Sequence, residues 1–174
     1  MANGNGRGIY ARNDGTAGLS ITVNNATGFN SDGIYANNGS SGTDLSIVAD
    51  GQVVSTYSNG IAALNFGTGS TSVNATNLTG DALVSGSRGI YAYSDASTTT
   101  STITANNVTG TNGDGIYARH EGSGDLSITA NNADGTAQVT GLTRGIYARN
   151  NNGGNLTITV DNVTGTNSDG IYAY

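Results

Sequence analysis

The chain has 174 residues, of which 28 are Gly, only 10% are charged, and none is Cys, Pro or Trp. Six basic residues against twelve acidic ones give a net charge of −6, which leaves no basic patch able to bind a nucleic acid backbone. The absence of Cys excludes disulfides and thiolate metal sites, and it is compatible with export through an oxidising compartment.

A repeated tetrapeptide divides the chain into coils. Gly-Ile-Tyr-Ala begins at Gly8, Gly33, Gly89, Gly115, Gly145 and Gly170, and the variant Gly-Ile-Ala-Ala begins at Gly60. The spacings of 25, 27, 29, 26, 30 and 25 residues are too similar for independent domains, so each repeat marks one coil. We therefore expect a single solenoid fragment over residues 1–174, with no cap at either end.

Two further apolar strands follow the tetrapeptide in each coil. The second strand centres on Ile21, Ile47, Val73, Ile103, Ile128 and Ile158, which lie 13 or 14 residues after the repeat Gly. The third apolar position comes five or six residues later, at Ala26, Val53, Leu78, Val108, Ala133 and Val163. Nearly all variation in coil length then falls after this position, with insertions at residues 80–86 and 135–141.

Short β-branched and aromatic strands, separated by Gly, Asn, Asp and Ser, predict an all-β protein. The expected fold is a single-stranded parallel β-helix with three strands per coil and about six coils of 25–30 residues. At a strand spacing of about 4.8 Å, six coils form a rod roughly 30 Å long.

The alternation of residues along each strand assigns its two faces. Ile9, Ala11 and their equivalents stay small and apolar, so they face the core and the Tyr between them faces out. In the second strand Ile21 faces in, whereas Ser20 and Thr22 face out. Equivalent residues of successive coils then stack into ladders.

The first ladder consists of Asn residues four positions after the central residue of the second strand. Its members are Asn25, Asn77, Asn107, Asn132 and Asn162, with an interruption at Gly51. Stacked amides hydrogen-bond from coil to coil and Asn suits turns, so we expect a structural role.

A charge ladder precedes the repeat Gly and consists of Arg7, Asp32, Asn59, Arg88, Asp114, Arg144 and Asp169. The signs alternate wherever both neighbours are charged, which favours one register, although each exposed pair contributes only about 0–1 kcal/mol. The ladder also reveals a larger repeat, because residues 6–36 closely match residues 144–174.

Outward Tyr residues form a stripe that is broken only at Ala62. Its members are Tyr10, Tyr35, Tyr91, Tyr117, Tyr147 and Tyr172. Such a stripe is either a binding platform for sugar rings or another protein, or a cross-strand stack that stiffens the sheet. The stack is the simpler interpretation.

The outer face of the second strand carries pairs of hydroxyl residues. The pairs are Ser20 and Thr22, Ser46 and Val48, Ser72 and Asn74, Thr102 and Thr104, Ser127 and Thr129, and Thr157 and Thr159. Regular hydroxyl pairs on a flat sheet resemble the ice-binding faces of some antifreeze solenoids, but Val48 and Asn74 interrupt them. Ser and Thr are also ordinary solvent-facing strand residues.

The sequence lacks the residues that parallel β-helix lyases and hydrolases use, which are converging acids with Arg or Lys and often calcium. The single His, His120, lies beside Glu121 in a Gly-rich segment and is expected in a loop. We expect no catalytic residue, no metal site, no cofactor and no enzymatic activity.

The combination of Gly-Ile-Tyr-Ala with a Leu-Ser-Ile-Thr or Leu-Thr-Ile-Thr strand and an Asn-x-Thr-Gly turn resembles the passenger repeats of bacterial autotransporters, over essentially the whole chain. The resemblance implies a right-handed helix that is secreted or displayed on the outer membrane of a Gram-negative bacterium. It also implies adhesion, aggregation or display, with a host or bacterial surface protein or a glycan as partner. The first residues lack signal-peptide features, and no stretch approaches the ~20 apolar residues of a membrane span.

The two ends of the stack predict self-association. Both expose unpaired strands with inward Ile and Val, which form a template for another chain. A second copy's Arg7 coil placed on the Asp169 coil would continue the alternating charges. Such a head-to-tail contact need not close, so we expect filaments or long oligomers, with a monomer as the alternative.

Overall fold

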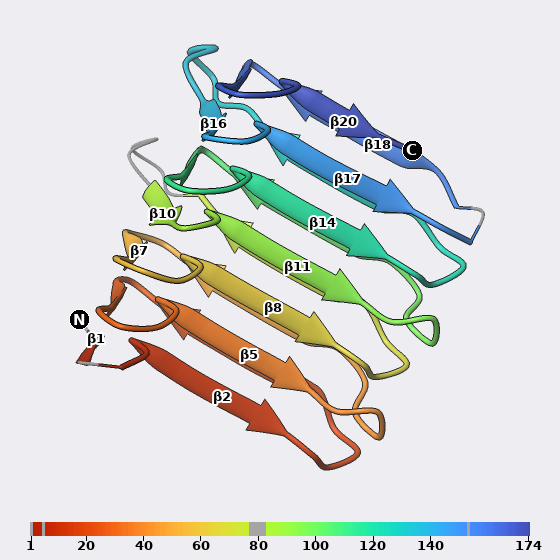
Figure 1. Cartoon of the computed structure of the whole chain (residues 1–174). Coiled ribbons are helices and arrows are strands. Elements are labelled where there is room, and N and C mark those ends of the chain that lie inside the picture. Colours follow the sequence, from red (N-terminus) through yellow and green to blue (C-terminus); the bar gives the residue numbers. More distant parts are fainter. Residues whose placement is uncertain (1, 5, 77–82, 153) are drawn as a thin grey trace.

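A computed structural model describes residues 2–4, 6–76, 83–152 and 154–174 of the chain. All regular secondary structure in these residues is β-strand, and paired strands run parallel. The chain passes through three sheets in turn and rises by one strand in each sheet per coil, which produces the stack seen in Figure 1. The predicted β-solenoid of about six turns, with three strands per coil, is confirmed.

Each sheet contains one kind of strand. The repeat sheet holds the tetrapeptides, in β2 (Ile9–Asn13), β5 (Ile34–Asn38), β8 (Ile61–Asn65), β11 (Ile90–Ser94), β14 (Ile116–His120), β17 (Ile146–Asn150) and β20 (Ile171–Ala173). The hydroxyl sheet holds β3 (Leu19–Val23), β6 (Leu45–Ala49), β9 (Thr71–Ala75), β12 (Ser101–Ala105), β15 (Leu126–Ala130) and β18 (Leu156–Val160). The third sheet holds β1 (Ala2–Gly4), β4 (Ala26–Gly28), β7 (Val53–Ser55), β10 (Leu83–Gly86), β13 (Asn107–Gly110), β16 (Gln138–Gly141) and β19 (Asn162–Gly165).

The core consists of aliphatic columns that run along the stack. Ile90 pairs with Ile61 on one side and with Ile116 on the other, and all three side chains are fully buried. Ile103 occupies the equivalent place in the hydroxyl sheet, between Val73 and Ile128. Burial of one such side chain contributes about 1.5–3 kcal/mol. The predicted inward and outward positions of both sheets are confirmed by these columns.

The prediction of the third strand was wrong in the two longest coils. Val84 pairs with Val53 and Val108, and Val139 pairs with Val108, so these two residues fill the core positions expected for Leu78 and Ala133. Leu78 lies outside the described residues, and Ala133 lies in the turn that precedes β16. The extra residues of these coils therefore come before the third strand and not after it.

The Gly that ends the third strand explains this register. A Cβ at Gly86 would collide with the backbone at Gly60 and Ser58, and one at Gly141 would collide with the backbone of Arg144. The chain turns so tightly here that a Gly is needed at the strand end. Val-x-Gly thus fixes the strand at both positions, whatever the length of the preceding loop.

Candidate functional site

The basic residues gather on one side of the solenoid. All six are Arg, and all lie in or directly before strands of the repeat sheet: Arg7 and Arg12 at β2, Arg88 at β11, Arg119 at β14, and Arg144 and Arg149 at β17. The outward Tyr residues lie on the same face. This Arg and Tyr face therefore combines charge with aromatic surface, which makes it a candidate binding site.

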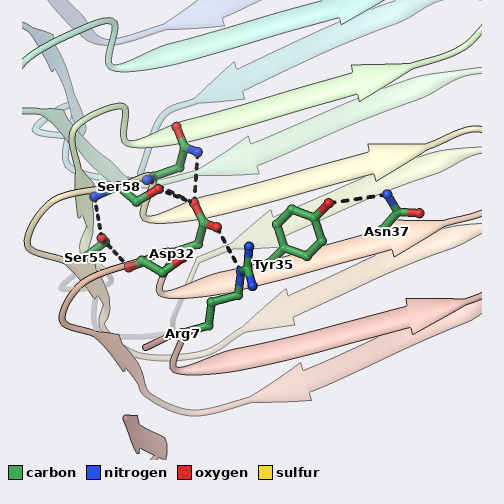
Figure 2. A network of polar contacts seen from close by, with 8 residues as sticks. Arg7, Asp32, Tyr35, Asn37, Ser55 and Ser58 are labelled. Atoms are coloured by element: carbon green, nitrogen blue, oxygen red, sulfur yellow. Dashed lines mark hydrogen bonds and ion pairs between the residues drawn. The ribbon is translucent and has the colours of Figure 1, made fainter. Parts of the chain in front are cut away.

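Asp32 is the centre of a polar network on this face (Figure 2). Arg7 donates Nε–H to Asp32 Oδ2 at 3.3 Å, and Ser58 donates its hydroxyl to Oδ1 at 2.7 Å. Asn59 donates its side-chain N–H to the same Oδ1 at 2.9 Å. Asp32 itself is only 4% exposed. Its carboxylate is therefore bound by hydrogen-bond donors from the preceding and the following coil, in place of water.

Asp114 repeats this arrangement with a second Arg. Arg144 donates Nε–H to Oδ1 at 2.8 Å and Nη2–H to Oδ2 at 3.2 Å, while Arg88 Nε lies 4.0 Å from Oδ2 on the other side. The alternating charges are thus neighbours in space. The expectation of exposed and weak pairs was wrong, because both interior Asp residues are buried and charge-assisted hydrogen bonds to buried groups are stronger. Asp169, at the last position of the ladder, is exposed.

The outward Tyr rings stack on one another along the solenoid. The rings of Tyr10 and Tyr35 lie 5.4 Å apart and almost parallel, and those of Tyr117 and Tyr147 lie 4.5 Å apart at 10°. Tyr147 continues to Tyr172 at 5.8 Å. Ring faces in such columns are turned toward neighbouring rings, which is the arrangement expected of a stiffening stack and not of an open sugar platform.

Arg side chains join the Tyr columns to the charge ladder. The guanidinium of Arg7 lies 4.5 Å from the ring centre of Tyr35, and that of Arg144 lies 4.4 Å from that of Tyr147. Both distances are typical of cation–π contacts. Burial, together with a hydrogen bond to the Tyr174 hydroxyl, raises the pKa of Tyr147 to about 12. The Arg and Tyr side chains of this face therefore make many of their contacts with one another.

An inner polar ladder, which the sequence analysis missed, ends the strands of the repeat sheet from β2 to β17, and its four central members are fully buried. Its members are Asn13, Asn38, Asn65, Ser94, His120 and Asn150, paired rung by rung. Asn13 Nδ2 donates to Asn38 Oδ1 at 2.7 Å, and Asn38 Nδ2 donates to Asn65 Oδ1 at 2.9 Å. The signal was present in the sequence, because each member lies five residues after the repeat Gly.

His120 belongs to this inner polar ladder, so its expected loop position was wrong. It is the last residue of β14 and is fully buried, with Nδ1 3.4 Å from the Thr98 hydroxyl. Its Nε2 has no hydrogen-bond partner, and neither has Oδ1 of Asn150 on the next rung. Burial lowers the pKa of His120. Glu121 follows on the outside, where Arg119 and Asn151 bind its carboxylate, so His120 and Glu121 do not face one another as an acid and base pair.

The predicted Asn ladder is not a continuous stack. Strand pairing places Gln138, and not Asn132, beside Asn162, while Asn132 bonds within its own turn to Thr136. Asn25 Oδ1 accepts the backbone N–H of Gln52 at 2.7 Å, and Asn107 Oδ1 accepts that of Gln138 at 3.0 Å. These amides therefore bind the backbone of the next coil. Asn77 lies outside the described residues.

The hydroxyl sheet carries its Ser and Thr pairs in register on the outer face. One column runs without interruption through Ser20, Ser46, Ser72, Thr102, Ser127 and Thr157. The other is broken at Val48 and Asn74. In the described ranges, no three His, Asp or Glu side chains are close enough together to hold a metal ion. The same ranges contain no long apolar helix of the kind that crosses a membrane.

Comparison with known proteins found no family model, no curated protein and no solved structure that matches the chain.

Proposed function

We propose that this chain is a non-enzymatic structural segment, a stiff stalk or spacer in a secreted or surface-displayed bacterial protein of the autotransporter type. The observation that carries the proposal is the internal use of the Arg and Tyr face. Tyr147 is only 8% exposed between Tyr117 and Tyr172, and Asp114 is held between two Arg side chains. A sheet whose outward side chains stack on and bind one another from coil to coil resists bending.

The stalk would extend further by stacking copies head to tail. Ile171 is 40% exposed, whereas its equivalent one coil earlier, Ile146, is fully buried. The exposed fraction of Tyr172 is 45%, against 8% for Tyr147. The differences correspond to the surface of Ile171 and Tyr172 that one more coil would cover. The first coil of a second copy could cover it, because residues 6–36 closely match residues 144–174.

Charge favours the same contact. Inside the chain, the buried Asp114 receives Arg144 from the following coil. Asp169 holds the equivalent ladder position at the exposed coil, with Ser168 as its side-chain donor. Arg7 of a second copy would give Asp169 the partner that Arg144 gives Asp114. Opposite charges in this arrangement favour this register through charge-assisted hydrogen bonds.

Sedimentation velocity and electron microscopy over a concentration series test the stacking. We expect oligomers that lengthen with concentration, and we expect Ile171→Lys or Ile9→Lys to return the chain to monomers, because each places a charge in the stacked core. Thr104→Lys adds the same charge on the hydroxyl sheet and should leave the oligomers unchanged. A chain that is monomeric at the highest concentration, or oligomers that survive both end variants, would contradict the proposal.

The hydroxyl sheet supports a second candidate function, ice binding, because one of its two hydroxyl columns is continuous. The breaks at Val48 and Asn74 argue against it. Thermal hysteresis that is lost in Thr104→Tyr would establish this function, and its absence in the wild type would reject it.

A further inference from the structure

Two exposed aromatic side chains, Phe29 and Tyr57, break the repeat at the equivalent turns of two successive coils. This turn joins the third sheet to the repeat sheet, and it begins with a backbone N–H that bonds to the preceding coil. Thr111 N donates to Gly86 O, Thr166 N to Gly141 O, and Phe29 N to Gly6 O at 3.1 Å. Each of these three residues directly follows the Gly that ends its third-sheet strand, which is Gly110, Gly165 or Gly28. Phe29 therefore stands where these coils have Thr. Tyr57 likewise stands where they have Asn112 and Asn167.

Neither aromatic residue is needed by the fold. Phe29 is 50% exposed and Tyr57 is 65% exposed, so they add little to the core. Their rings lie 5.8 Å apart and almost perpendicular, at 87°. In a T-shaped contact the edge of one ring meets one face of the other, so the remaining faces have no aromatic neighbour, whereas Tyr117 and Tyr147 each lie between two rings of the Tyr stripe. The pair thus keeps open ring faces, which these inner rings of the stripe do not.

Polar groups lie beside the pair. Ser58, the neighbour of Tyr57, donates its hydroxyl to Asp32, and the Arg7 side chain that pairs with Asp32 is 38% exposed (Figure 2). The ion pair makes this corner close to neutral, and exposed polar residues adjoin both aromatic residues in the chain, Asn30 after Phe29 and Thr56 before Tyr57. Exposed ring faces bordered by such groups suit a ligand that has both C–H faces and hydroxyls.

The size of the pair decides between a sugar and a protein as its partner. A Phe or Tyr side chain presents about 150–250 Å², so the exposed parts of both rings amount to roughly 230 Å². A protein interface takes about 800 Å² from each partner. The smaller area is that of one or two sugar rings.

We propose that Phe29 and Tyr57 form a binding site for a neutral carbohydrate, with a pyranose ring stacked on the open ring faces and its hydroxyls bonded to the neighbouring polar groups. Phe29 lies in the turn after β4, at the side of the first coil, and Tyr57 lies in the same turn of the second coil, so the site borders the coil that stacks in the proposed filament and lies far along the chain from Ile171. It goes beyond the structural role, since a stalk without sugar affinity would still be a stalk.

Saturation-transfer NMR and calorimetry with cellohexaose, mannohexaose and the hexamer of N-acetylglucosamine test this site. We expect saturable binding of at least one of these probes, and a loss of about tenfold or more in affinity in Phe29→Thr and Tyr57→Asn, since each removes one ring face. Both variants install the residue that other coils carry, so the circular dichroism spectrum should not change. Leu142→Thr, which introduces the same residue at the equivalent position four coils later, should bind like the wild type.

Two results would overturn the proposal. One is the absence of saturable binding to all three probes, and the other is binding that both aromatic variants leave intact. A shift in sedimentation caused by these variants without any sugar binding would assign the pair to contact between copies of the chain. Head-to-tail stacking is measured separately through Ile171→Lys, so either proposal can fail without the other.

Discussion

His120 places an ionisable group inside the solenoid, and this predicts a stability that falls in mildly acidic solution. The side chain is fully buried beside Thr98 and Asn150, and burial lowers its pKa from 6.5, partly offset by the charges of Glu121 and Asp125. The folded chain therefore keeps His120 neutral at pH values where the unfolded chain takes up a proton. Stability is fully present above pH 6.5 and is lost as the pH falls below it.

The size of the effect follows from proton linkage. If the folded state stayed neutral throughout, each pH unit below 6.5 would cost on the order of 1 kcal/mol of stability. This slope is an upper limit, because some protonation of the folded state and the two nearby carboxylates reduce it. The expected loss between pH 7.5 and pH 5.5 lies below this limit.

The inner polar ladder supplies the matched variant, His120→Asn. Asn already fills the equivalent rungs at Asn38 and Asn65, where it is fully buried and hydrogen-bonded. Urea unfolding followed by circular dichroism at pH 7.5 and pH 5.5 should show a loss in the wild type that the variant does not share. Glu121→Gln, on the outside of the same coil, should keep most of it. An equal pH dependence in the wild type and His120→Asn would refute the reasoning and assign the effect to the acids.

Two substitutions on the Arg and Tyr face should move stability in opposite directions. Asp114→Asn removes a buried carboxylate that binds two Arg residues but keeps its shape, so urea unfolding should show a loss of about 1.5–3 kcal/mol. Asp14→Asn breaks only the exposed pair with Arg12 and should cost less than about 1 kcal/mol; an equal cost would contradict the burial argument. Ala62→Tyr fills the one gap in the Tyr stripe and should raise stability by about 0.5–1 kcal/mol in thermal unfolding, while a lower midpoint would show that the gap is sterically required.

Strand parity predicts most of the fold. Ile116 and Ala118 face the core, so the same alternation places His120 inside. The Gly-rich residues after His120 favour a loop, and this local signal conflicts with parity. Asn13 also faces inward, and its role is recognisable only when its hydrogen-bond partner on the next coil, Asn38, is considered.

Spacing was a poorer guide than local motif in the third sheet. Leu78 and Ala133 lie five residues after the central residue of the second strand, as Val108 does, and this spacing predicts them as core positions. A loop between two strands can lengthen at little entropic cost, so distance along the chain fixes no register. The Val-x-Gly ending does fix it, because the turn after Gly86 or Gly141 leaves no room for a side chain.

A repeat protein separates the residues that build the stack from those that serve another purpose. The Tyr rings, buried Asp residues and inner Asn amides recur because each binds its equivalent or its neighbour in the next coil, and stacking accounts for them. A break such as Ala62 stays buried and adds no new surface. Phe29 and Tyr57 differ, since they replace the repeat residues with larger and more apolar ones that remain half exposed or more. Their exposure is unfavourable unless something covers the rings, so the departure from the repeat marks this turn, and not the more conspicuous Tyr stripe, as the place where the rod would meet a ligand.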